Sequence, residues 1–179
     1  GIVEADDLGM YVVKFRGAGQ GRKALVAEVV VGELGRRLGL PVPELVVVEL
    51  DSSMASAEPD EEVQDLLRAS HGTNLGMDFL PGALPFTLPA DPPLDPAFAA
   101  DVVWLETLVT NVDRTARNPN LLTWHGRTWL IDHGAAFFRQ HADRPLAQSA
   151  GEAVPMLAEH VLLPLAGPLA EADARLAGP

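Results

Sequence analysis

The chain has 179 residues, of which 47% are apolar, and its formal net charge is −12, so we expect one domain or two small lobes with a cleft between them. The acidic balance, with no basic run, argues against a nucleic-acid partner, and no apolar run approaches the ~20 residues of a membrane span. Because cysteine is absent, disulfides, thiolate catalysis and Cys-ligated zinc are excluded, and the composition fits a cytoplasmic protein.

The first predicted element is a hairpin that ends in a lysine. Residues Ile2–Ala5 and Met10–Val13 are strand-like, and a tight connection over Asp6–Gly9 joins them. Lys14 directly follows two valines, and a buried ammonium group is costly unless an anionic group meets it. The alternative is a lysine at a strand end whose stem carries the charge into solvent.

Because the first residue is Gly1 rather than Met, we also expect a trimmed piece of a longer chain.

A glycine-rich segment, 16–23, follows the hairpin. It is not a Walker A loop, because Gly21 is followed by Arg22 and Lys23, and its glycines do not fit Gly-x-Gly-x-x-Gly. Two interpretations stay open for this segment. It is either a flexible link or a phosphate cradle, since the amides that begin the following helix favour anions.

The segment 23–38 has the spacing of a helix with one buried apolar face, and Gly39 and Pro41 give the expected stop. Glu28 lies beside that face, which is a poor place for an unpaired carboxylate. A strand is predicted next, over Glu44–Leu50. The helix residues predicted to be buried are Leu25, Val26, Val29, Val30, Leu34 and Leu38.

The middle of the chain alternates loops with short elements. Residues 51–60 are typical of a surface loop, and residues 61–70 of a short acidic helix with solvated charges. A strand from Asn74 must leave its sheet at Pro81-Gly82. A proline-rich linker or lid, 85–96, leads to a helix that Asp95-Pro96 opens. Its predicted buried residues are Phe98, Val102, Leu105, Leu108 and Val109.

The most informative stretch runs from Asn111 to Phe137. A polar loop holds Asp113 and, five residues on, Asn118; two apolar runs then surround a His125-Gly126 turn, and Asp132 follows the second run. Folding this hairpin back brings the two carboxylates and the carboxamide to the same end of a small sheet. All three are hard oxygen ligands that suit Mg²⁺ carrying a polyphosphate, and one carboxylate can stay free as a base.

Several alternatives remain within this stretch. Asn120 is a second carboxamide that could replace or supplement the first one as a ligand. Arg114 and Arg117 either bind the transferred phosphate or pair with the acids. His133 and His125 raise the alternative of a zinc or iron site, although a histidine in a turn is usually just solvated. After Phe137 the chain is polar over 139–153 and helical over 154–176, with breaks at Pro164 and Pro168.

The pattern Asp-x-x-x-x-Asn from Asp113, followed by strand-Asp-x-Gly at Asp132, resembles the catalytic and metal loops of the protein-kinase-like superfamily. Ordinary protein kinases carry His-Arg-Asp and Asp-Phe-Gly. The wording Asp113-Arg114 and Asp132-His133-Gly134 is closer to the HipA-like, phosphoinositide-kinase-related branch. The turn Leu38-Gly-Leu-Pro-Val-Pro43 also recurs in HipA-like proteins. The strand lysine, a helix glutamate, a hinge-like strand and the two acidic loops follow one another in the family's order.

The resemblance implies an α+β, bilobal protein-kinase-like fold. A small antiparallel sheet plus one helix would form an N-terminal lobe over 1–80, with a hinge near 77–82. A mainly helical C-terminal lobe over 83–179 would carry the catalytic hairpin. Because a full kinase usually has more helices in its larger lobe, we expect a minimal or truncated domain.

The resemblance also implies roles for individual residues. Lys14 would bind the nucleotide phosphates and pair with Glu28, with Glu33 as the rival partner. Met77 would face the back of the nucleotide pocket, although this stretch also fits an ordinary edge strand and turn. Backbone groups implied to bond the adenine edge are those of Asp78 and Leu80. Asp113 would orient or deprotonate the acceptor hydroxyl, and the implied metal ligands are Asn118 and Asp132.

The function implied is an ATP-dependent kinase that uses Mg²⁺ and ATP and phosphorylates an unidentified acceptor, with a protein Ser/Thr as one class. No clear glycine-rich loop precedes Lys14 to cover the phosphates. A catalytically weak pseudokinase or nucleotide-binding module is therefore one alternative. A metal-dependent hydrolase is another.

Overall fold

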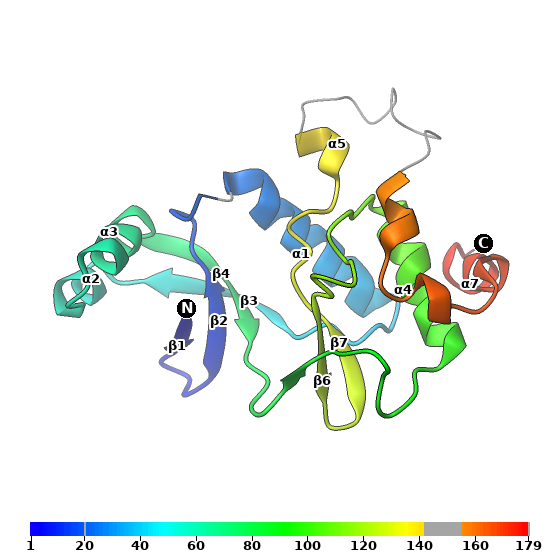
Figure 1. The fold of residues 1–179 in the computed structure, drawn as a ribbon. Helices are drawn as coiled ribbons and strands as arrows, with labels where there is room; N and C mark the ends of the chain where they lie inside the picture. The colour runs from blue at the N-terminus through cyan, green and yellow to red at the C-terminus, as the bar shows by residue number, and fades with distance from the viewer. Residues whose placement is uncertain (20, 142–154, 179) are drawn as a thin grey trace.

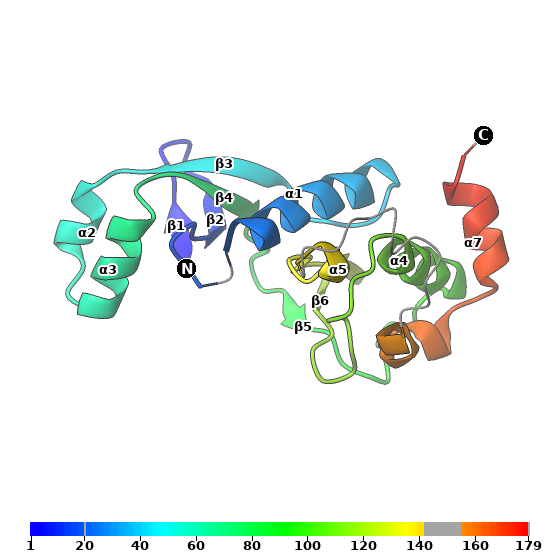
Figure 2. The same ribbon diagram turned by 90° about the horizontal axis from the view of Figure 1, so that it is seen from above.

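The computed structural model describes residues 1–19, 21–141 and 155–178 and confirms the predicted α+β class, with two small antiparallel sheets. The described helices are α1 (Gly21–Arg37), α2 (Ser53–Ala57), α3 (Glu61–Ala69), α4 (Pro96–Leu108), α5 (Phe138–His141) and α7 (Leu169–Leu176). Figure 1 and Figure 2 show an elongated molecule with α2 and α3 at one end and α4 and α7 at the other. Helix α1 runs between these ends.

The larger sheet contains β1 (Ile2–Glu4), β2 (Met10–Lys14), β3 (Leu45–Leu50) and β4 (Gly72–Asp78). Their order is β1-β2-β4-β3, and all neighbours are antiparallel. The predicted N-terminal hairpin and the predicted third strand are confirmed. The edge-strand interpretation of the stretch from Asn74 is wrong, because β4 is hydrogen-bonded to a strand on each side.

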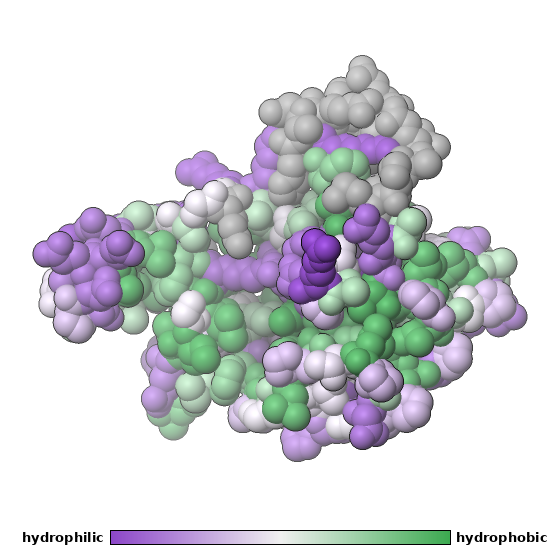
Figure 3. Space-filling model, viewed as in Figure 1, coloured by the Kyte–Doolittle hydropathy of each residue, from purple (hydrophilic) through white to green (hydrophobic). Residues whose placement is uncertain are grey.

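One face of this sheet is buried and the other is partly open. Val13, Val48 and Leu50 form a small core, against which Leu67 of α3 packs. The predicted acidic helix is confirmed as α3, which Asp60 caps by accepting from the Glu62 and Val63 amides at 2.9 and 3.2 Å. The predicted loop before it contains the short helix α2. This end of the molecule is largely hydrophilic (Figure 3), as expected for solvated charges.

Helix α1 corrects the predicted burial. Val26, Val29 and Val30 are exposed, and the buried face consists of Ala24, Ala27, Glu28, Val31, Gly32 and Gly35. The reason is close packing: a Cβ on Gly32 would lie 2.7 Å from Cδ1 of Leu45 on β3. The glycines at 32 and 35 allow this approach, and Val26, Val29 and Val30 face outward. Leu34 and Leu38 are partly buried against the main core, as predicted, so the spacing of apolar residues misplaced the three valines but not the last turns of the helix.

Helix α4 lies in the main core. The side chain of Asp95 accepts from the Ala97 amide at 2.9 Å, which confirms the predicted N-cap. Val102, Leu105 and Val109 are buried as predicted, whereas Leu108 is exposed, contrary to the prediction. Leu108 faces solvent because the buried face of α4 runs through Glu106, which is fully buried.

The second sheet contains β5 (Leu84–Pro85), β6 (Leu121–Trp124) and β7 (Arg127–Leu130), in that order. The predicted hairpin is confirmed. His125 and Gly126 both have positive φ, 47° and 70°, as a two-residue turn between antiparallel strands requires. The hairpin therefore delivers the segment 131–134 back toward the loop that starts at Asn111.

The last part of the chain is less regular than the predicted helical stretch. Two 3-10 helices, Pro155–Glu159 and Leu163–Leu165, precede α7. Pro168 is the N-cap of α7 and marks a helix boundary, as predicted. The predicted break at Pro164 is wrong, because Pro164 lies inside the second 3-10 helix. Most of the predicted polar segment 139–153 lies outside the described residues. Within the described ranges, no helix combines the length and apolar character that crossing a membrane requires.

Candidate active site

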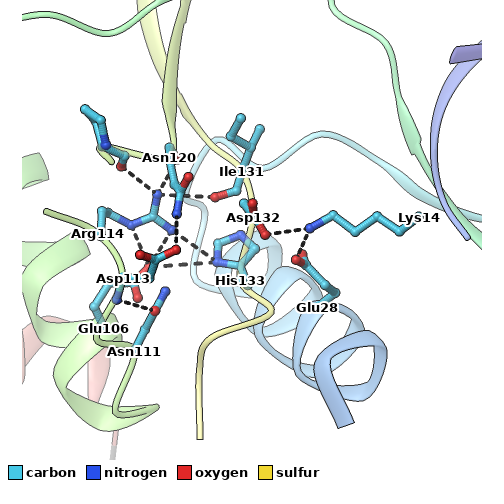
Figure 4. Close-up of polar contacts among 11 residues, drawn as sticks. Lys14, Glu28, Glu106, Asn111, Asp113, Arg114, Asn120, Ile131, Asp132 and His133 are labelled. Carbon is cyan, nitrogen blue, oxygen red and sulfur yellow. Dashed lines mark hydrogen bonds and ion pairs between the residues drawn. The ribbon is translucent and has the colours of Figure 1, made fainter. Parts of the chain in front are cut away.

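Lys14, at the end of β2, contacts carboxylates from two other parts of the chain (Figure 4). Its Nζ donates to Oε1 of Glu28 on α1, and to Oδ1 of Asp132 at 2.7 Å. The exposed fractions of the three side chains are 19%, 4% and 44%, respectively. The ammonium group therefore joins the sheet, α1 and the segment after β7 at a partly open position.

The Lys14–Glu28 contact explains why two charged residues lie at buried or half-buried positions. Each charge compensates the other, which removes most of the cost of desolvation. The predicted partner of Lys14 is thus observed, and the rival Glu33 does not take its place. Gly134 leaves room for this pair, because a Cβ there would lie 3.1 Å from Oε1 of Glu28.

Asp132 has an unusual backbone and a stabilised charge. Its φ is 56°, in the left-handed region that non-glycine residues adopt infrequently and often at functional sites. Burial by itself would raise the pKa of the Asp132 carboxyl, but the hydrogen bond and charge of Lys14 outweigh it and hold the pKa below its ordinary value. The carboxylate is therefore ionised at neutral pH.

Asp113 is the centre of a second group of polar side chains. Its Oδ2 accepts from Nδ2 of Asn118 at 2.8 Å and from Nδ2 of Asn120 at 3.2 Å. Its own amide donates to Oδ1 of Asn111 at 3.1 Å. Because both donating carboxamides use their NH₂ groups, their oxygens point elsewhere and can serve as ligands. The structure thus brings the two carboxamides together around the Asp113 carboxylate.

Behind this loop lies a buried ionic cluster of Glu106, Arg114 and His133. Arg114 donates from Nε and Nη2 to Oε1 of Glu106 at 2.9 and 2.7 Å, and both side chains are 0% exposed. Burial alone would raise the pKa of Glu106, but the Arg114 charge and the His133 contact lower it to about 2. The interpretation that Arg114 binds the transferred phosphate is wrong, because its guanidinium is enclosed by protein. Arg117 is exposed.

The two histidines considered as metal ligands occupy different environments, one exposed and one buried. His125 occupies the exposed β6–β7 turn. His133 is buried, with Nδ1 at 3.3 Å from Nη2 of Arg114 and 3.8 Å from Oε1 of Glu106. Over residues 1–19, 21–141 and 155–178 there is no group of three or more His, Asp or Glu side chains arranged to hold a metal ion. This arrangement does not support the zinc or iron alternative.

The face of the sheet that carries Lys14 is apolar and partly open. Val12 pairs with Met77, and Lys14 pairs with Leu75. Since side chains alternate along a strand, Val12, Leu75 and Met77 share the face of Lys14. All three are half-buried.

The backbone at the end of β4 is already partly used within the protein. The Asp78 amide donates to the Glu44 carbonyl at 2.8 Å, and the Leu80 carbonyl accepts from the Ala83 amide at 3.1 Å. Nε1 of Trp124 donates to the Pro81 carbonyl at 2.8 Å, which ties the β6–β7 hairpin to this stretch.

The glycine-rich segment after β2 uses its amides internally. The amides of Arg16 and Gly17 donate to Oδ1 of Asn74 and Oγ of Ser70, at 2.8 and 3.0 Å. The amides of Ala18 and Gly21 donate to backbone carbonyls at 3.0 and 3.4 Å. A phosphate cradle needs amides that are free to point at the anion, so these contacts favour the link interpretation.

Sequence patterns did not predict the roles of Glu106 or His160, nor that the acid paired with Arg114 is Glu106. His160 is buried, and its Nδ1 accepts from the Leu162 amide at 3.1 Å. One signal for Glu106 was present: it lies four residues after Val102 and three before Val109, on a face otherwise apolar. A charge at such a position needs a buried partner, and Arg114 follows within ten residues.

Comparison with protein-family models gives a match over residues 2–149 to the family described as HipA-like kinase. The matched span includes β1 to β7 and every residue of the two polar groups described above. No curated protein and no solved structure matches the chain. The chain belongs to the HipA-like kinase family, which marks it as a kinase in general and implies ATP as a substrate.

Proposed function

We propose that the chain is a Mg²⁺- and ATP-dependent phosphotransferase whose nucleotide lies between the Lys14 face of the larger sheet and the loops that carry Asp113 and Asp132. The observation that carries the proposal is the contact of Lys14 with both Glu28 and Asp132, residues that are 14 and 118 positions away. In this proposal residues 1–80 form the smaller lobe of a kinase-like fold, and residues 83–179 belong to the larger one.

Lys14 neutralises charge on the α- and β-phosphates of the nucleotide. The nearly buried Glu28 holds its ammonium group in place through one hydrogen bond, and the other N–H donors can turn to phosphate oxygens. The contact with the more exposed Asp132 is the one that is given up when the nucleotide binds. Asp132 then has both carboxylate oxygens available.

The residues present fit a magnesium ion. Asp132 and the side-chain oxygen of Asn118 are hard oxygen donors, and Mg²⁺ characteristically takes one or two protein ligands together with phosphate oxygens and water. A small protein donor set is therefore sufficient when a polyphosphate supplies the rest. When bound, the ion supplies charge stabilisation on the phosphates. Asn120 is the alternative carboxamide ligand.

Asp113 orients the acceptor hydroxyl and takes its proton as phosphoryl transfer proceeds. Its Oδ2 is fixed by the two carboxamides of Asn118 and Asn120, which leaves Oδ1 to face an acceptor. A serine or threonine hydroxyl of a protein is the acceptor class proposed. This role requires only a hydroxyl group on the acceptor.

The adenine ring lies on the apolar platform of Val12, Leu75 and Met77 in this proposal. Since the Asp78 amide and the Leu80 carbonyl are engaged within the protein, the adenine edge is assigned to the Asp78 carbonyl and the Leu80 amide. Recognition through backbone groups places little demand on the side chains, which accounts for an exposed acid at Asp78.

The proposal is tested by calorimetric binding of Mg·ATP together with ADP production in the presence of candidate protein acceptors. Lys14→Ala removes charge-assisted hydrogen bonds to phosphate and is expected to weaken Mg·ATP binding about 10- to 100-fold. Asp132→Asn is expected to abolish turnover while circular dichroism stays unchanged. Asp65→Asn makes the same chemical change on exposed α3 and is expected to behave as wild type. Unaltered Mg·ATP affinity in Lys14→Ala would remove this lysine from the site and contradict the proposal.

One observation favours a nucleotide-binding module without turnover. The β1–β2 turn, where a phosphate-covering loop would be expected, is closed on itself: Asp7 accepts from the Gly9 amide and from the Tyr11 hydroxyl, each at 2.7 Å. Its acidic residues repel rather than attract phosphates. Mg·ATP binding that requires Lys14 but gives no ADP with any acceptor would support this second function. A cytoplasmic location stays a prediction.

A further inference from the structure

Arg114 is a fully buried cation next to the proposed catalytic Asp113. Its guanidinium contacts groups from three parts of the chain: the last turns of α4, the loop 113–120 and the segment after β7 (Figure 4). The proposed reaction assigns it no role, because no substrate reaches it. A buried arginine is retained only where its hydrogen bonds compensate for its desolvation.

Nη1 of Arg114 donates to backbone carbonyls on both polar loops. It is 3.3 Å from the Pro119 carbonyl and 3.3 Å from the Ile131 carbonyl, and it also contacts the Asn120 carbonyl. Pro119 directly follows Asn118, and Ile131 directly precedes Asp132. One rigid group thus fixes the backbone beside both proposed metal ligands.

Glu106 fixes the guanidinium in turn. Its Oε1 accepts from Nε and Nη2 of Arg114 at 2.9 and 2.7 Å. These two hydrogen bonds fix the plane of the guanidinium, and so keep Nη1 directed at its three carbonyl partners. Nη2 also approaches Nδ1 of His133, the residue after Asp132. The Arg114 carbonyl accepts from the Val161 amide at 2.9 Å, which anchors the backbone at the same point.

We propose that Arg114 is a positioning residue that sets the separation of Asn118 and Asp132, and thereby the affinity of the site for a divalent cation. This inference rests on the proposed function. Lysine cannot substitute, because a single ammonium group on a flexible stem cannot hold Glu106 and three carbonyls at once. Residues that orient metal ligands without touching the metal typically contribute 10- to 100-fold to metal affinity.

The test measures Mn²⁺ binding in the presence of ADP by electron paramagnetic resonance. Mn²⁺ serves as a spectroscopic substitute for Mg²⁺. Arg114→Lys is expected to weaken Mn²⁺ binding about 10- to 100-fold. Its affinity for a fluorescent ADP analogue measured in EDTA is expected to stay within about twofold of wild type, because Lys14 and the apolar platform are untouched. Arg68→Lys on α3, an exposed arginine, is the matched control and is expected to change neither value.

A second variant covers the case in which Arg114→Lys does not fold. Glu106→Leu combined with Arg114→Met replaces the buried ion pair with apolar side chains of similar volume, a change that other proteins tolerate in stability. This double variant removes the guanidinium without leaving an unpaired charge. The same loss of Mn²⁺ affinity, with metal-free nucleotide binding retained, is expected from it.

The outcomes separate the two proposals. If wild type binds Mn²⁺ with ADP and the folded variants bind it equally well, the positioning role is wrong and the proposed function stands. If wild type shows no nucleotide-dependent Mn²⁺ binding, the proposed function fails and the positioning role fails with it. An equal loss of metal affinity and metal-free nucleotide affinity in a variant would indicate general disruption of the site and would also overturn the positioning role.

Discussion

Two ionic clusters lie next to each other in this molecule, and they differ in access to solvent. Lys14, Glu28 and Asp132 form the open cluster, in which the Asp132 side chain is 44% exposed. Glu106, Arg114 and His133 form the closed cluster, with side chains 0 to 2% exposed. Both contain a cation between acceptors, so charge pairing alone does not distinguish a reactive group from a supporting one.

The difference in exposure accounts for the difference in proposed role. An ion pair with one solvent-accessible partner can exchange that partner for a ligand at little cost, because water replaces what is lost. A sealed pair cannot exchange without leaving a buried charge unpaired. We therefore infer that the open cluster changes partners during the reaction, while the closed one keeps its geometry. Five predictions test this contrast.

The largest expected effect is on turnover. Asp132→Ala removes a proposed metal ligand from the open cluster and is expected to lower kcat by about 10³-fold, in the range seen for loss of one transition-state-stabilising group. Unfolding by urea should show little change, because Asp132 is partly exposed. Turnover that survives in this variant would exclude Asp132 from the reaction.

The closed cluster is expected to show the opposite behaviour. Glu106→Leu alone leaves Arg114 as a buried, unpaired cation, and it should lower the free energy of unfolding by about 3–5 kcal/mol. Addition of Arg114→Met should restore most of this stability. The measurement is urea unfolding followed by circular dichroism; the two single variants and the double variant form a cycle that isolates the coupling.

Acid should weaken the protein through a neighbour of the closed cluster. Burial is the main reason that the pKa of His160 is lowered to about 4, so folded His160 stays neutral where unfolded histidine takes up a proton near pH 6.5. The contribution of neutral His160 to the free energy of unfolding is fully present above about pH 6.5. It is lost as the pH falls toward 4, because the unfolded state then binds more protons than the folded state. The full loss is on the order of 3 kcal/mol.

The pH dependence is measured as the free energy of unfolding in urea between pH 7 and 4. His160→Asn keeps an acceptor for the Leu162 amide and removes the titrating group, so it should flatten the slope in this window. Glu106 contributes with the same sign at lower pH, because its pKa is lowered to about 2. An unchanged slope between pH 6.5 and 4.5 in His160→Asn would contradict the assignment.

A smaller effect is expected from Gly134→Ala, which adds a methyl group 3.1 Å from Oε1 of Glu28. The carboxylate must shift by a few tenths of an ångström, and the position of Lys14 shifts with it. We expect kcat/KM for ATP to fall about tenfold, which corresponds to about 1.4 kcal/mol in the activation free energy. Gly19→Ala, on an open loop, is the matched control.

The smallest effect is expected on the outer face of α1. Val30→Ser replaces an exposed valine, so the free energy of unfolding should change by no more than about 0.5 kcal/mol. Val31→Ser, one position on, faces the core and should cost several times as much. Equal losses in the two variants would contradict the observed orientation of the helix.

Local sequence patterns predicted the positions of helix starts and turns where capping or turn residues were present. Asp95-Pro96 marked the start of α4, and His125-Gly126 marked the turn of the β6–β7 hairpin, because capping and turn geometry depend on residues adjacent in sequence. The interior position of β4 and the burial of Glu106 were not predicted. Both depend on partners that are distant in the chain.

The sequence by itself determined the hairpins, the helix starts and the order of lysine, glutamate and acidic loops, because these follow from neighbouring residues and their periodicity. The tertiary structure decided which valines of α1 are buried, and it joined Asp132 to the Lys14–Glu28 pair and Glu106 to Arg114. Gly32 lets α1 approach β3 closely enough to turn Glu28 toward Lys14. The hairpin return brings Asp132 to the same ammonium group, across 118 residues of sequence, and no local pattern encodes that distance.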